Sequence, residues 1–215
     1  MKRFSWLIIP ALLLALNASA SEQGTVNRCA NIVRDFRQLP EKSIPRSVLR
    51  DSKGLAIITV VKAGFIFSGK GGDGVVVAKT PRGWSGPSFI GTGGAGWGFQ
   101  AGAEVTDFVF VLNTDAAVRA FSKKGNVTLG VDASVAAGPV GRDAHAGVTP
   151  HAAIYTYSRS KGLFAGAAVE GAVIATRTEA NARYYGRPLL ARDILSGRVP
   201  PPPAAALLGA ALGGR

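Results

Sequence analysis

The chain has 215 residues, the length of one domain, and can bury a substantial core. A single cysteine excludes an internal disulfide, so the fold depends on packing alone. The formal net charge of +12 favours anionic partners, and its dispersed basic residues lack the runs that are typical of nucleic-acid-binding tails.

The N-terminus has the pattern of a secretory signal peptide over residues 1–20. A short basic segment precedes an apolar run from Phe4 to Leu16, and Ala18-Ser19-Ala20 matches a cleavage site before Ser21. The run is shorter than the ~20 residues that span a bilayer, which favours a cleaved leader over a retained anchor. We therefore expect an exported protein, periplasmic or extracellular. Its location would argue against nucleic acid and against actin as partners.

Residues 21–215 carry a net charge of +10, because the leader holds two of the 25 basic residues and none of the 13 acidic ones. They open with a helical pattern from Thr25, the expected cap, to Arg37. Apolar residues recur along it at three- and four-residue spacing. The favoured interpretation is a helix packed on the domain. The alternative is a basic amphipathic helix on a membrane, with these residues in contact with lipid: Arg28, Val33, Arg34, Phe36 and Arg37.

From Gly54 onward, short β-branched and aromatic runs alternate with glycine, which indicates strands and turns. The small residues at alternating positions after Trp97 allow sharp bending and close packing. Helices are expected at residues 114–122, 179–185 and 189–195. The predicted fold is α+β and β-rich, with a strongly curved antiparallel sheet, or a partly closed barrel or sandwich, and a few packing helices.

Two G-x-G-x-x-G spacings raise the question of nucleotide binding: Gly69, Gly71 and Gly74, and then Gly91, Gly93 and Gly96. A dinucleotide site requires a helix directly after the glycines. Both copies are followed by strand-forming residues, so we interpret them as connections between strands. Asp73-Gly74 is a favoured pair for a hairpin turn.

No catalytic residue, metal site or cofactor is predicted. Ser158 and Lys161 match S-x-x-K, but at the end of a predicted strand and without its companion motifs. His145 and His151 have no metal-ligand partners at suitable spacing. Three carboxylates are left open as a group that could converge: Glu104, Asp107 and Glu170.

The stretch from Ile44 to Asn113 resembles the SYLF domain family, and further motifs follow in the same order: AAGPVGRDA, YTYSRSKGLFAGAAVEG, NARYYG and ILSG. The resemblance covers residues 44–199, with AVEG where the family has Ser-Leu-Glu-Gly. It implies binding of membrane lipids, phosphoinositides in eukaryotic members, and no enzymatic activity. The family's actin role belongs to cytoplasmic members, which often carry an SH3 domain.

The function expected is attachment to phospholipid or anionic membrane surfaces as a peripheral membrane protein, without cofactors. Candidate headgroup ligands flank the predicted strand turns: Lys62, Lys70, Lys79, Arg82 and Lys161. The alternative is a non-enzymatic structural or protein-interaction module of the cell envelope. Residues 21–199 are expected to form the domain, and residues 200–215, which are rich in Pro, Ala, Gly and Leu, a flexible tail.

Overall fold

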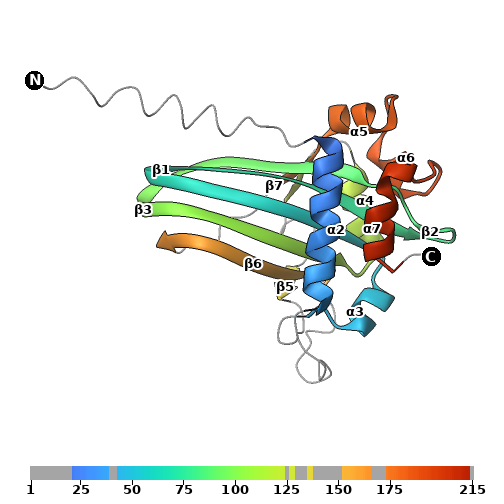
Figure 1. The fold of residues 1–215 in the computed structure, drawn as a ribbon, viewed down its shortest axis with the longest axis horizontal. Coiled ribbons are helices and arrows are strands. Elements are labelled where there is room, and N and C mark those ends of the chain that lie inside the picture. Colours follow the sequence, from blue (N-terminus) through green and yellow to red (C-terminus); the bar gives the residue numbers. More distant parts are fainter. Residues whose placement is uncertain are drawn as a thin grey trace, which may run out of the picture.

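The structure is a computed structural model that describes residues 21–38, 43–123, 126–128, 135–137, 152–165 and 173–213. The signal peptide expected at residues 1–20 therefore lies outside the described residues. The elements shown in Figure 1 are, in chain order, α2 (Glu22–Gln38), α3 (Arg46–Asp51), β1 (Gly54–Thr80), β2 (Gly83–Trp84), β3 (Ser88–Leu112), α4 (Asp115–Ser122), β4 (Asn126–Thr128), β5 (Val135–Ala137), β6 (Ile154–Ala165), β7 (Val173–Thr176), α5 (Thr178–Tyr185), α6 (Ala191–Leu195), the 3₁₀ turn η1 (Pro203–Ala205) and α7 (Ala206–Ala211).

The sheet is built around two very long strands, β1 with 27 residues and β3 with 25. They pair antiparallel almost from end to end, from Gly54 opposite Leu112 to Val76 opposite Ser88. Both strands bend near their middles and run back, so each has two arms (Figure 1). The second arm of β3 pairs with β6, and its first arm pairs with β7. The prediction of a strongly curved, β-rich α+β fold is confirmed.

Glycines permit the two arms of β1 to approach each other closely. A Cβ added at Gly74 would lie 1.9 Å from the carbonyl oxygen of Ile57, and one at Gly72 would lie 2.6 Å from that of Thr59. Only glycine leaves room for this contact between backbones. By contrast, a Cβ at Gly69 or Gly71 would meet nothing within 4 Å.

The predicted hairpin at Asp73-Gly74 is wrong. Both residues lie inside β1, with Asp73 opposite Gly91 and Gly74 opposite Ile90. The reversal comes seven residues later, where β1 joins β2 and Gly83 adopts a φ of 106°. The glycine-rich segments lie inside β1 and β3 and do not connect separate strands, and no helix follows them directly.

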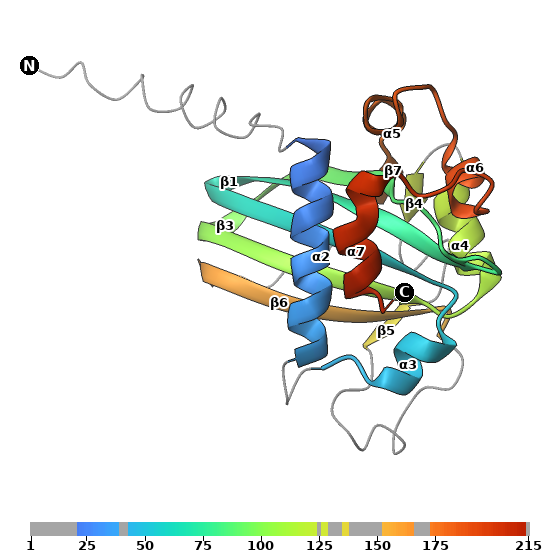
Figure 2. The ribbon, with the colours of Figure 1, turned by 45° about the vertical axis from the view of Figure 1, so that its right-hand side comes forward.

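Helices cover both faces of the sheet. Helices α2 and α7 lie side by side on one face, over inward-facing side chains that include Leu55, Ile57 and Val109 (Figures 1 and 2). Helices α4 and α6 pack on the other face of the sheet. There Phe121 and Leu195 form a second core cluster with strand side chains that alternate with those of the first, among them Ile58. This two-sided core explains why one arm of β1 reads as a continuous apolar run.

Helix α2 begins earlier than its sequence pattern predicts. The Ser21 hydroxyl accepts a hydrogen bond from the Gly24 amide, which is the geometry of a helix cap. Thr25, the expected cap, is buried inside the helix. The apolar stripe, which ends at Phe36, is packed in the core, as the favoured interpretation expected.

The C-terminal segment differs from the flexible tail that its composition suggested. Residues 203–211 form η1 and α7, and α7 packs against α2. Leu208 is 1% exposed and Ala211 is also buried. Alanine and leucine are strong helix formers, and here they supply an apolar face to the core. Within the described residues, no helix combines the length and the apolar character needed to cross a bilayer.

Candidate functional site

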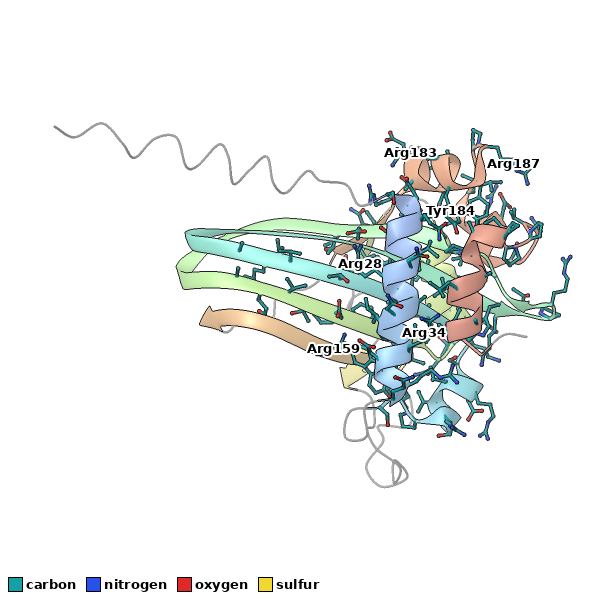
Figure 3. The ribbon with its side chains drawn as sticks, in the orientation of Figure 1. Arg28, Arg34, Arg159, Arg183, Tyr184 and Arg187 are labelled. Atoms are coloured by element: carbon teal, nitrogen blue, oxygen red, sulfur yellow. The ribbon has the colours of Figure 1, made fainter. Side chains whose placement is uncertain are left out.

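A carboxylate on β1 holds the middle of α2 against the sheet. Asp73 Oδ2 accepts a hydrogen bond from the Thr25 hydroxyl at 2.6 Å and forms an ion pair with the guanidinium of Arg28. Arg28 is labelled on α2 in Figure 3. The side chains of Arg28 and Asp73 are only 33% and 30% exposed. Partial burial makes this pair stronger than an exposed one.

A second group of charges lies near the C-terminal end of α2. Arg159 on β6 contacts Asp35 of the helix at 2.8 Å and Asp107 of β3 at 3.2 Å. Asp107 also accepts a hydrogen bond from the Thr59 hydroxyl at 2.8 Å. Although partial burial opposes the shift, hydrogen bonds to Asp35 and Asp107 raise the pKa of Arg159 above its ordinary value.

The N-terminal end of α2 is tied to α5. Glu22 and Arg183 form an ion pair at 2.6 Å. Although burial opposes it, hydrogen bonding to its own backbone and to Arg183 lowers the pKa of Glu22. Helix α2 is therefore attached at its start, middle and end by acidic groups whose charge is neutralised within the fold.

The five candidate headgroup residues separate into two groups at opposite ends of the sheet. Lys79 and Arg82 lie where β1 meets β2, at the end covered by helices (Figure 1). Lys79 donates hydrogen bonds to the carbonyl oxygens of Leu49 and Arg50 and lies over the Trp84 ring. Its pKa is lowered mainly by burial. Lys79 thus anchors α3, whereas Arg82 is exposed.

Lys62, Lys70 and Lys161 belong to the opposite end, near the bend of the long strands. Lys62 and Lys70 stand on either side of the bend in β1 and are partly exposed. Lys161 occupies the position on β6 opposite Val105. The structure brings these three positions to one end of the sheet and separates them from Arg82.

The residues of the proposed membrane helix are divided between core and surface. Val33 and Phe36 are buried. Arg28 is paired with Asp73, Arg34 donates to the Asn31 side chain, and Arg37 donates to the Ala211 carbonyl oxygen at 2.5 Å. In this structure the helix is a packed element, and two of its three arginines hold it to its neighbours.

Among the described residues, the candidates for catalysis are not arranged as an active site. Ser158 and Lys161 lie on β6, as the predicted strand requires, and no helix begins there. Glu104 and Asp107 lie on β3, where Asp107 is bound to Arg159 and Thr59. His145, His151 and Glu170 lie outside the described residues. Within the ranges that are described, no three metal-binding side chains gather.

Sequence reasoning did not predict the contacts that hold α2, which are made by Asp73, Asp107 and Arg159. Their partners are separated by 45 or more residues along the chain, so no local spacing reveals them. It also missed a hollow beside the start of α5, lined by Thr176, Arg177, Thr178, Glu179, Ala180 and Arg183. There the charge of Arg183 is balanced by Glu22.

Comparison with known families identifies the family of this chain. Residues 93–214 match the family described as "Ysc84: Las17-binding protein actin regulator". The match covers more than half of the chain and agrees with the SYLF resemblance. The chain belongs to the Ysc84/SYLF family.

Several relatives are similar over most of this chain. LAS seventeen-binding protein 3 of Saccharomyces cerevisiae is 54% identical over 169 residues, which are 76% of this chain and 37% of the relative. Protein YSC84 of the same organism is 54% identical over 195 residues, 86% of this chain and 42% of the relative. Human SH3 domain-containing YSC84-like protein 1 is 46% identical over 183 residues, with coverages of 81% and 54%. The chain thus spans about half or less of these relatives.

Proposed function

We propose that this chain is a non-enzymatic binding module that attaches to anionic phospholipid surfaces. The observation that carries the proposal is the distribution of charge. Within the described ranges, six carboxylates form ion pairs inside the chain, namely Glu22, Asp35, Asp51, Asp73, Asp107 and Asp193. Several basic side chains at both ends of the sheet are exposed or partly exposed, among them Lys62, Lys70, Arg82, Arg119, Lys123 and Arg187.

The magnitude of this surplus fits reversible attachment. Each basic side chain near an anionic membrane contributes ~1 kcal/mol, so three or four on one surface give useful binding that salt weakens. The family resemblance adds phosphoinositide-type headgroups as preferred ligands. The N-terminal signal pattern supports export, with the protein acting at a periplasmic or extracellular membrane surface. The N-terminal sequence of the protein recovered from each cell fraction tests export.

Vesicle co-sedimentation tests lipid binding. The protein is mixed with phosphatidylcholine vesicles, with and without phosphatidylglycerol or a phosphoinositide, at low and high salt. We expect sedimentation with the anionic vesicles, decreasing as salt increases. Failure to sediment with any anionic vesicle at low salt contradicts the proposal.

Binding of a protein partner is the second candidate function. The family description names a Las17-binding protein and actin regulator, and one relative is named LAS seventeen-binding protein 3. The expectation against actin depended on the signal peptide, which lies outside the described residues, and the comparisons do not support it. Co-sedimentation with actin filaments tests this function. Because filaments are also acidic, the salt dependence must be compared with that of vesicle binding.

A further inference from the structure

The bend of the long strands extends beyond the helices that cover the rest of the sheet (Figures 1 and 2). We call residues 61–71 of β1 and 92–105 of β3 the free end of the sheet. Among the described side chains, burial in β1 stops at Thr59 and resumes at Gly74, and in β3 it stops at Ile90 and resumes at Thr106. Among the described residues, the free end thus lies beyond helices α2 and α7, which cover the rest of this face.

Apolar residues occupy this uncovered end. Val61 and Val105 stand directly opposite each other and are 36% and 40% exposed. Farther along the ribbon, the backbone register places Phe67 opposite Trp97. The sequence adds Phe65, Ile66 and Phe99 within the same bend. Exposed apolar side chains such as Val61 and Val105, at an end of the sheet that the described helices do not reach, are typical of an interaction surface.

Basic residues outnumber acidic residues in this part of the sheet. The free end and the adjoining part of β6 carry Lys62, Lys70 and Lys161, against one carboxylate, Glu104. The acidic groups at its base, Asp73 and Asp107, are paired with arginines. Aromatic residues prefer the membrane interface, and lysines beside them meet lipid phosphates while their alkyl chains cover apolar surface. An acidic protein surface would match the lysines alone, but an anionic bilayer matches both features.

We propose that the free end is the part of the molecule that enters the headgroup region of an anionic bilayer, with α2 still packed on the sheet. This inference rests on the proposed lipid binding and names its site. It assigns Lys62, Lys70 and Lys161 to the membrane side. Lys79 and Arg82, at the opposite end of the sheet, then face away, because one flat bilayer cannot contact both ends.

Tryptophan fluorescence distinguishes insertion of this end from attachment elsewhere. Trp97 lies at the free end, and Trp84 lies at the opposite end beside Lys79. Two variants of the full chain, Trp84→Phe and Trp97→Phe, both with Trp6→Phe, each retain one of these reporters. Vesicles of phosphatidylcholine and phosphatidylglycerol with brominated acyl chains should shift Trp97 emission to the blue and quench it, and should leave Trp84 unchanged.

A matched pair of substitutions tests the same surface by affinity. Val105→Glu places a carboxylate at the free end and should weaken vesicle binding by about tenfold, since it adds repulsion and removes apolar contact. Leu207→Glu makes the same change on α7, at a side chain that is 38% exposed, and should bind as the parent does. Both variants should keep the parent's melting temperature, because both positions are exposed.

The outcomes separate the two proposals. Vesicle binding with unquenched Trp97, or with full affinity in Val105→Glu, overturns the assignment of the free end and leaves lipid binding intact. Absence of vesicle binding by the parent chain overturns both. A parent that elutes from gel filtration as an oligomer, dissociated by Val105→Glu, overturns the assignment in favour of contact between two copies.

Discussion

One carboxylate, Asp73, links α2 to the second arm of β1, and we predict that its charge matters for stability. Asp73→Asn keeps the size and the acceptor for Thr25 but leaves the partly buried Arg28 without its counter-charge. Because both side chains keep about a third of their exposure, solvent limits the expected loss to ~1 kcal/mol. Chemical denaturation measures it.

The exposed pair Arg50–Asp51 supplies the control for this prediction. Asp51→Asn should leave the denaturation midpoint unchanged. A double-mutant cycle of Asp73→Asn with Arg28→Met should then show a coupling energy. Zero coupling would mean that the Asp73–Arg28 contact does not hold the helix.

Two glycines three residues apart on β1 should respond oppositely to alanine. Gly74→Ala drives a Cβ into the Ile57 carbonyl oxygen, so the arms of β1 must separate, at a cost of about 3 kcal/mol. Gly71 lies in open space and its φ is not positive, so Gly71→Ala should be neutral or slightly stabilising. Equal melting temperatures for the two variants would contradict the close approach of the arms.

At the scale of elements, α7 provides a direct test of whether the C-terminal segment belongs to the fold. Leu208→Ala empties a buried position and should cost about 3 kcal/mol. Its neighbour Leu207 is largely outside the core, so Leu207→Ala should change stability by less than about 0.5 kcal/mol. Thermal unfolding compares them. A flexible tail would make both variants neutral.

Elements with a local signal were predictable from the sequence, and elements that depend on distant contacts were not. The helix expected at residues 114–122 forms as α4, and the Thr114 hydroxyl at its start accepts a hydrogen bond from the Ala117 amide. Helix α7 was missed because prolines precede it and its apolar face has a purpose only beside α2.

The long strands show the same limit. Short strands separated by turns were predicted from Gly54 onward, but residues 54–80 form one bent strand, because β3 pairs with β1 through the glycines. Composition indicated the basic candidate residues of the site. The sequence did not show that these residues lie at two opposite ends of the sheet, because their positions depend on where the long strands bend.

At the scale of the whole molecule, two effects predict opposite responses to alkaline pH. The net charge of +12 falls as pH rises, which reduces repulsion within the chain and favours the folded state. Burial of ionisable side chains has the opposite effect on stability at alkaline pH. It raises the pKa of the Cys29 thiol from 9.0 to about 12 and that of Tyr184 from 10.0 to about 12, and it also raises the pKa of Tyr157 and Tyr185.

We predict that the effect of the buried ionisable groups exceeds the relief of charge repulsion. Because the folded chain holds these protons more tightly than the unfolded chain, their stabilisation is complete below pH 9 and is lost between pH 9 and about 12. Each unit of pKa difference is worth ~1.4 kcal/mol, whereas repulsion between exposed charges is screened by salt. The melting temperature in physiological salt should therefore fall above pH 9. Cys29→Ala should make the fall between pH 9 and 10 shallower, because the phenols ionise later; a melting temperature that rises over this interval would show that relief of repulsion dominates.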